Sequence, residues 1–477
     1  MLISKLLSPY ALGATVLLAS SGLASAQSLN PEQQQLRAIY QELVEINTTN
    51  SVGSCTAAAT AMASHLKKVG YRGADLQIIV PPGAPKKGNL VARLKASSPD
   101  STNPMKPLLL LAHIDVVEAK REDWIRDPFK LVEENGFFYA RGASDDKAMA
   151  AIFVANMLRY KQEKLTTKRD LILALTCDEE LVPTKNNGVE YLLKHHRPLI
   201  DAEIALNEGG GGSLDKNGKP VRHGVQAGEK IFQSFQLEVT NSGGHSSVPR
   251  KDNAIYQLAE GLSRLGKFDF PFRLTPTTRG FFETMSTLES GQLAADMKAI
   301  LHESVDTAAL ARLSASSPFY NASLRTTCVA TTVEAGHAAN ALPQRAQANI
   351  NCRILPGETV EQTQTMIKTI LADDSIKVST VGVATVSPAQ PLHPELMKTV
   401  TDLTMQMWPG TPVVPTMSPG GTDGRFLNNA GIWTYSVSGI FNYPEGSNAH
   451  GLNERLPVKS LYEGQQFLYA LAKRLSQ

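Results

Sequence analysis

Acidic residues follow a buried apolar run near the middle of the chain, and their types and positions fit the chemistry of a metal hydrolase. The stretch 171–180, LILALTCDEE, predicts a buried strand. In an open α/β sheet, ligands bind at the carboxyl ends of the strands. Successive side chains on an extended backbone point different ways, so one of Glu179 and Glu180 can hold a cation while the other faces the substrate. A solvated turn is the ordinary alternative for such a triplet taken alone.

Further candidate metal ligands fall where strands end or chains turn. They are His113, Asp145, Glu208 and His450. With Glu180 they make two histidines and three carboxylates, which suits two zinc-like ions with a bridging carboxylate. Three carboxylates and a bridging hydroxide would balance two dications. Taken singly, each has another reading, such as a core histidine, a helix cap or a loop residue.

Asp115 is a candidate for orienting one of these ligands. It lies two residues after His113, on the same side of an extended strand. Its carboxylate is therefore expected to accept the imidazole N–H of His113, as partners of metal-ligating histidines commonly do.

The order of expected elements predicts an α/β catalytic domain with an inserted α+β domain. Strands at 89–95, 107–112, 171–177 and 203–206 alternate with helices at 148–160 and 188–196, after helices at 31–46 and 56–69. This alternation predicts a mostly parallel sheet covered on both faces. From about residue 229 the pattern becomes strands at 231–240, 323–333, 346–354 and 376–386 with helices at 253–265 and 358–371. We predict catalytic segments 27–228 and 388–477, with 229–387 inserted between them.

The long connection within the inserted segment, residues 273–318, is expected to carry helices of its own. A C-terminal helix is expected over 458–475.

The first 26 residues resemble a secretory signal. Lys5 is followed by a mostly apolar stretch, and 24–26 has the small residues of a cleavage site. The protein is therefore expected to be secreted, and periplasmic in a host with two membranes. An uncleaved membrane anchor is the alternative, weakened as a membrane span by Pro9 and the serines, and no cysteine directly follows the segment to accept a lipid.

Composition narrows the classes of partner. Of 477 residues, 42% are apolar and 19% charged, which excludes a disordered chain. The net charge of +2 comes from interspersed signs rather than a basic block, so nucleic acid and anionic membranes are not expected partners. Small neutral or zwitterionic substrates fit better.

Four cysteines in an oxidising compartment could form up to two bridges. Cys177, inside an apolar strand, is expected to be a small core residue rather than a bridge partner. Cys328 and Cys352 stand symmetrically about Asn340 in strand-like stretches. They are expected to face each other on adjacent antiparallel strands, while a bond between them is left open.

Eight motifs in this order make the chain resemble a known family. The stretches HIDVV, YARGASDDKA, CDEE, NEGG, GGHSSVP, ANALPQRAQANINCR, SPGGTDGRF and AHGLNE run from residue 113 to 454. They are similar to those of the zinc-dependent peptidases and deacylases that include glutamate carboxypeptidase G, aminoacylase, succinyl-diaminopimelate desuccinylase, carnosinase and carboxypeptidase S. The resemblance implies a di-zinc catalytic domain interrupted by a lid or dimerisation domain.

The resemblance also assigns roles to the acidic and imidazole residues. One ion would be held by His113 and Glu208, and Co²⁺ or Mn²⁺ could substitute for Zn²⁺. The remaining assignments are Glu180 and His450 for the second ion, Asp145 as the bridge, Glu179 as general base, and a cis peptide between Asp145 and Asp146.

Substrate contacts are implied for the inserted domain. His245 resembles a histidine that reaches the substrate carbonyl, often from a partner subunit, and a turn histidine is the other reading. Asn340 and Arg353 resemble residues that bind substrate polar groups, although Arg353 could instead form a surface ion pair. In the catalytic domain, the implied contacts are Gly420, Gly421, Thr422 and Arg425.

These observations predict a secreted di-zinc hydrolase that cleaves an amide next to a free carboxylate, in a small peptide or an N-acyl amino acid, with a metal-bound hydroxide as nucleophile. A homodimer through the inserted domain is compatible with this function. Ala148 replaces the family's usual glycine, and the 273–318 insert argues against a biosynthetic desuccinylase. The alternatives are a dipeptidase that needs a free amine, and a catalytically silent metal-stabilised binding protein, which would not need Glu179.

Overall fold

The structure is a computed structural model that describes residues 28–100, 102, 104–181 and 184–477. The predicted signal segment, residues 1–26, lies outside the described residues. Within the described part, no helix combines the length and apolarity needed to cross a membrane.

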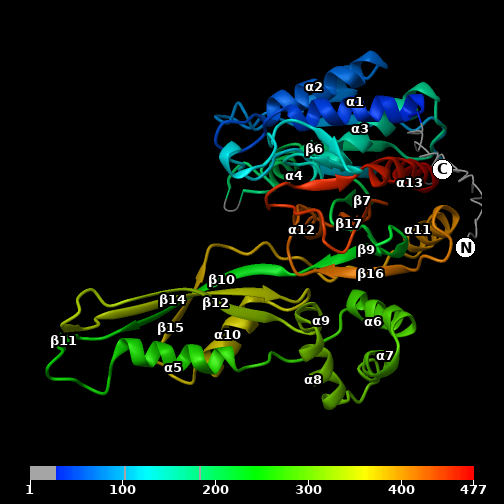
Figure 1. Ribbon diagram of the computed structural model, residues 1–477. Coiled ribbons are helices and arrows are strands. Elements are labelled where there is room, and N and C mark those ends of the chain that lie inside the picture. Colours follow the sequence, from blue (N-terminus) through cyan, green and yellow to red (C-terminus); the bar gives the residue numbers. More distant parts are fainter. Residues whose placement is uncertain (1–27, 101, 103, 182–183) are drawn as a thin grey trace, which may run out of the picture.

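A large mixed sheet forms the core of the catalytic domain (Figure 1). Its central strands β6, β3, β7 and β17 are parallel to one another. At one edge, β2 runs antiparallel to both of its neighbours, β6 and β1. β3 and β6 are buried at every position, as expected for strands covered on both faces. The strands, in sheet order, are β1 (Leu76–Ile79), β2 (Asn89–Leu94), β6 (Leu171–Thr176), β3 (Leu108–His113), β7 (Ile204–Asn207), β17 (Trp433–Ser436), β9 (Pro220–Glu229), β8 (Gly212–Leu214) and β18 (Phe441–Asn442), with β16 (Val413–Ser418) paired to β9.

Helices cover both faces of this sheet, and alternate strand residues point to the two sides. Leu108 and Leu110 join the apolar cluster under one set of helices, whereas Leu109 and Leu111 join the cluster on the opposite face. The first face is covered by α1 (Pro31–Glu45), α2 (Cys55–Lys68), α3 (Lys147–Gln162), α11 (Pro394–Met407) and α13 (Val458–Ser476), and the second by α4 (Gly188–His195) and α12 (Gly424–Asn429). The predicted doubly covered α/β sheet is confirmed, with antiparallel strands added at its edges.

A second, four-stranded sheet forms the core of the inserted segment, which is called the lid from here on, and it lies below the catalytic sheet in Figure 1. The order of elements along the chain is the predicted strand, helix, strand, strand, helix, strand. Alternate residues of β10 and β14 pack with the helices into a separate apolar cluster. The elements are β10 (Ile231–Thr240), α5 (Ala254–Gly266), β12 (Thr327–Ala335), β14 (Arg345–Ile354), α10 (Val360–Leu371) and β15 (Lys377–Val381), with a two-stranded ribbon of β11 (Gly244–His245) and β13 (Ala341–Leu342).

The insert at 273–318 does carry helices, and they pack on the catalytic sheet. Phe282, Met297 and Leu313 form an apolar cluster that also contains Val414 of β16. The expected strand at 323–333 starts later than predicted, at Thr327, because the preceding residues form the last helix of the insert. These helices are α6 (Pro276–Leu288), α7 (Gly291–Ala299), α8 (Thr307–Ser316) and α9 (Pro318–Leu324). The boundaries proposed for the inserted domain stay a prediction.

Smaller elements complete the described chain. A three-stranded sheet is formed by β19 (Arg455–Pro457), β5 (Phe137–Tyr139) and β4 (Val132–Glu134), and short 3-10 helices cover Gly73–Asp75, Arg121–Asp123 and Arg197–Leu199.

Two disulfides link the four cysteines. Cys328 and Cys352 lie opposite each other on β12 and β14, as predicted, and they are bonded. The expectation for Cys177 was wrong, because it is bonded to Cys55 at the start of α2. Both sulfurs of that pair are buried, so a core position and a bridge were compatible.

Candidate active site

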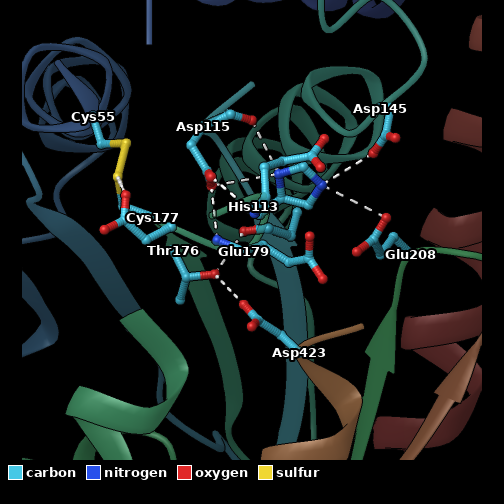
Figure 2. Close-up of polar contacts among 12 residues, drawn as sticks. Cys55, His113, Asp115, Asp145, Thr176, Cys177, Glu179, Glu208 and Asp423 are labelled. Atoms are coloured by element: carbon cyan, nitrogen blue, oxygen red, sulfur yellow. Dashed lines mark hydrogen bonds and ion pairs between the residues drawn. A yellow bond between two sulfur atoms is a disulfide. The ribbon is translucent and has the colours of Figure 1, made fainter. Parts of the chain in front are cut away.

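Strand ends and loops from distant parts of the sequence bring the candidate ligands together, and Figure 2 shows His113, Asp145 and Glu208 among them. His113 is the last residue of β3, and Glu208 directly follows β7. Glu179 and Glu180 follow the neighbouring strand β6. Because these strands are parallel, their carboxyl ends meet at one edge of the sheet, where α/β proteins bind ligands.

The first group surrounds His113, whose side chain is almost fully buried. Its Nε2 lies 3.1 Å from Asp145 Oδ1 and 3.6 Å from Glu208 Oε2. Burial lowers the pKa of His113, but the Glu208 carboxylate and hydrogen bonds to acidic neighbours outweigh it and raise the pKa well above its usual value. An imidazole among carboxylates is therefore in a strongly negative environment.

The second group shares the same aspartate. His450 Nε2 lies 3.2 Å from Asp145 Oδ2 and 2.9 Å from Glu180. The two oxygens of Asp145 thus face different histidines, which is the arrangement of a bridging carboxylate. Hydrogen bonds to Asp145 and then to Glu180 raise the pKa of His450 to about 10.

The donor set fits divalent metal ions. Ligand atoms of His113, Asp145 and Glu180 lie within 4.8 Å of one another, as do those of His113, Glu179 and Glu208. Imidazole nitrogen and carboxylate oxygen are common zinc ligands, and two cations would relieve the repulsion among the carboxylates. Since Glu179 lies this close to His113 and Glu208, distance alone does not separate its role from that of a ligand.

Glu179 has the environment of a base beside such a centre. Burial, followed by the charge of Glu208, raises the pKa of Glu179 well above its usual value. Perturbed carboxylates of this kind are common at active sites.

Asp115 holds the glutamates and the histidine together. Its Oδ1 accepts the backbone N–H of Glu179 at 3.3 Å, and its Oδ2 accepts that of Glu180 at 3.1 Å. His113 Nδ1 is 3.5 Å from Asp115 Oδ1 and closer, at 3.0 Å, to the Asp115 backbone oxygen. The predicted orienting role is therefore shared between the carboxylate and the main chain.

Sequence reasoning assigned no role to Glu454, although it ends the motif AHGLNE. Its side chain is fully buried. The carboxylate accepts from Arg141 Nη1 at 2.8 Å and from the backbone N–H groups of Gly142, Ser144 and Asp145 at 3.0, 2.7 and 2.9 Å. It thus fixes the turn that presents Asp145, whose peptide bond to Asp146 is cis, as predicted.

Asp423 is a second residue that the sequence did not single out. It is buried, and it accepts hydrogen bonds from Asn187 Nδ2 at 2.6 Å and Thr176 Oγ1 at 3.3 Å. Thr176 ends β6, so Asp423 ties the strand that leads to Glu179 to the start of α12. Nothing in the motif SPGGTDGRF shows this contact in advance.

A pocket of about 660 Å³ opens beside the two glutamates, between the sheet edge and the lid. The guanidinium of Arg353 stacks on Phe232, 4.8 Å from the ring centre, and that of Arg425 stacks on Phe426, at 4.7 Å. Within the described part of the chain, neither guanidinium takes part in an ion pair or a hydrogen bond. The predicted substrate residues that line this pocket are Arg353, Gly420, Gly421 and Arg425.

Thr422 does not line the pocket, because its N–H and hydroxyl bind Glu229 instead. His245 and Asn340 lie together at the far end of the lid, where the N–H of Ser246 donates to Asn340 O at 3.1 Å. Both are exposed and neither lines the pocket. The structure therefore does not bring these two residues to the pocket of their own chain.

Comparisons with known proteins agree with this site. The model of peptidase family M20/M25/M40 matches residues 109–474. The N-fatty-acyl-amino acid synthase/hydrolase PM20D1 of Homo sapiens is 28% identical over 377 residues, which cover 77% of this chain and 74% of the human protein.

Solved structures share the fold. An M20 family metallo-carboxypeptidase, Sso-CP2 from Sulfolobus solfataricus, has a TM-score of 0.64 at 20% identity, covering 93% of this chain and 99% of that one. The YXEP protein of Bacillus subtilis, described as a dinuclear metal binding peptidase from the M20 family, has a TM-score of 0.59 at 12% identity, covering 93% and 98%.

The fold and the site define a metal-dependent hydrolase of amide bonds. The chain belongs to peptidase family M20/M25/M40.

Proposed function

We propose that the protein is a di-zinc hydrolase that cleaves an amide next to a free carboxylate, and that N-acyl amino acids are its substrates. One observation carries the proposal. Two guanidiniums that form no ion pair or hydrogen bond among the described residues line the same pocket as Glu179, Glu180 and His450. An arginine is the natural bidentate partner of a carboxylate, so the pocket suits a substrate with a free carboxylate.

The residues divide the work as follows. His113 and Glu208 would hold one zinc ion, Glu180 and His450 the other, and Asp145 would bridge them. When bound, the ions would polarise the amide carbonyl and acidify a water molecule. Glu179 would take a proton from that water and return it to the leaving amine, a role that its raised pKa supports.

The acyl side of the substrate is proposed to be apolar. The pocket is lined by Leu181, Ile231, Phe232, Val383 and Phe426, which suit a hydrocarbon chain better than a charged amine. The human relative is named for N-fatty-acyl amino acids, which agrees with this choice. We also propose export of the protein, from the pattern of its first 26 residues.

A panel of substrates tests the proposal. The zinc-loaded protein is incubated with N-acyl amino acids of different chain length, the corresponding amides without a free carboxylate, and dipeptides with and without a blocked amine. Products are read by mass spectrometry. We expect cleavage of the N-acyl amino acids and poor cleavage of the amides. Cleavage of free dipeptides alone would contradict the N-acyl assignment, and cleavage of nothing in the panel would contradict the function.

A further inference from the structure

The two arginines of the pocket come from different domains, which are joined at a short crossover. Arg353 belongs to lid strand β14, whereas Arg425 lies in helix α12 of the catalytic domain. Strand β9 ends at Glu229 and β10 begins after Lys230, so the chain passes from one sheet to the other at these two residues. Both side chains are only 2% exposed.

Glu229 reaches into the catalytic domain. Its Oε2 accepts the backbone N–H of Thr422 at 2.7 Å and the Thr422 hydroxyl at 3.0 Å. The carbonyl of Thr422 in turn accepts the backbone N–H of Arg425 at 3.2 Å. Glu229 therefore fixes the turn that carries Arg425.

Lys230 reaches in the opposite direction, into the lid. Its Nζ donates to Arg325 O at 2.8 Å and to Thr327 Oγ1 at 3.1 Å. Thr327 is the direct cross-strand partner of Arg353 in the β12–β14 pair. Phe232, on which Arg353 stacks, is its partner on the other side, in β10. Lys230 therefore fixes the strands that carry Arg353.

Ionisable groups are costly to bury unless their polar atoms are paired, and a simple crossover between sheets could be built from apolar residues. Burial raises the pKa of Glu229 to about 7 and lowers that of Lys230 to about 7. Burial thus disfavours the charged form of both groups. Lys230 Nζ is hydrogen-bonded to the lid and Glu229 Oε2 to the catalytic domain, while Glu229 Oε1 has no partner among the described residues.

We propose that Glu229 and Lys230 are positioning residues that set the spacing between Arg425 and Arg353. They thereby determine how tightly the two arginines bind the substrate carboxylate. This inference rests on the proposed function. It predicts that loosening either contact weakens recognition of the carboxylate and leaves the metal centre intact.

The test compares an N-acyl amino acid with its carboxamide, which lacks the negative charge. Lys230→Met and Glu229→Leu should raise KM for the acid about tenfold with little change in kcat, the pattern for lost binding that is equal in ground and transition states. The preference for acid over amide should fall toward that of Arg353→Met. Glu229→Gln keeps an acceptor oxygen for Thr422 and, unlike Glu229→Leu, should retain most of the preference for the acid over the amide. Metal content should match wild type in every variant.

Two further variants separate positioning from general damage. Thr327→Val removes the hydroxyl that Lys230 binds without changing the shape of the side chain, and it should lower the preference in the same direction. If Lys230 acts through Arg353, the double variant Lys230→Met/Arg353→Met should be little worse than Arg353→Met alone.

An unchanged preference for the acid in Lys230→Met and Thr327→Val would overturn the inference. So would a double variant whose loss equals the product of the losses in Lys230→Met and Arg353→Met. Either result would leave the proposed function in place. A wild-type protein that cleaves neither substrate would overturn both.

Discussion

The backbone N–H of Glu179 donates a hydrogen bond to the carboxylate of Asp115 at 3.3 Å, although the two residues follow different strands. The neighbouring N–H of Glu180 binds the other oxygen of the same carboxylate, at 3.1 Å. Asp115 also lies beside His113 Nδ1. The buried side chain of Asp115 thus positions the proposed base, Glu179, and two proposed metal ligands, Glu180 and His113.

Replacing Asp115 should therefore impair metal binding and turnover together. For Asp115→Ala we expect a loss of about 10-fold to 100-fold in metal affinity or activity, the usual scale for a partner of a metal-ligating histidine. Metal titration and steady-state kinetics measure the two effects. Asp115→Asn is the matched control, because its amide oxygen can still accept one of the two N–H groups. Wild-type affinity and turnover in Asp115→Ala would remove the orienting role.

Removal of metal should lower stability as well as activity. Asp145, Glu180 and Glu208 crowd around two histidines, and a bound cation relieves their repulsion in the folded state alone. A ligand at about 100 times its Kd adds about 2.7 kcal/mol to the free energy of unfolding, so the chelated protein should melt several degrees lower.

Readdition of zinc should restore both the melting temperature and turnover, and Co²⁺ or Mn²⁺ can be tested in the same way. A melting temperature that no metal or chelator changes would contradict a metal site at this cluster.

The two disulfides should differ in their effect on activity. Cys177 directly precedes the Asp178–Glu180 segment, and its bond to Cys55 ties that segment to helix α2. Cys55→Ala/Cys177→Ala should lose turnover even well below its melting temperature. Cys328→Ala/Cys352→Ala, the matched control, removes a bond within the lid.

Either pair should lower the free energy of unfolding, by about 2 to 5 kcal/mol. Thermal melts and kcat are measured on all three proteins. Equal turnover in the two double variants would show that the Cys55–Cys177 bond does not position the catalytic segment.

His245 is predicted to act on a substrate bound to another copy of the chain. It is exposed, its Nδ1 accepts from the Ser247 hydroxyl, and it does not line the pocket of its own chain. His245→Ala should bind two metals and keep most of its substrate affinity. Turnover should fall about 10²-fold to 10³-fold, the scale for losing one donor to a developing oxyanion.

A mixing experiment tests the shared site. Inactive His245→Ala and Glu179→Ala chains should regain part of the activity when hybrid dimers form. Absence of recovery, with hybrids verified by native mass spectrometry, would exclude a shared site. Unchanged turnover in His245→Ala alone would exclude the catalytic role.

The parts of the site that were visible in the sequence are those fixed by local patterns. His113, Glu180 and Glu208 follow apolar runs, and parallel strands place such residues at one sheet edge. The facing cysteines on β12 and β14 were also predictable from a local pattern, because a hairpin places positions that are symmetric about its turn opposite each other.

The parts that were missed depend on contacts between distant segments. Glu454 binds a turn about 310 residues earlier, and Lys230 binds a backbone oxygen 95 residues later. The bond between Cys55 and Cys177 spans 122 residues, and burial in a strand looked like a sufficient reason for Cys177. No periodicity or spacing reports such pairings, because they arise only when the sheet has assembled.

The variant Glu179→Ala separates a general base from a metal ligand, because Glu179 lies close enough to His113 and Glu208 to be either. Metal content, melting temperature and turnover on an N-acyl amino acid are measured on the wild type, on Glu179→Ala and on Glu180→Ala. We predict that Glu179→Ala keeps two metal ions and the wild-type melting temperature but loses at least about 100-fold in turnover, whereas Glu180→Ala loses metal. Loss of metal from Glu179→Ala, or wild-type turnover in it, would show that Glu179 is not the general base.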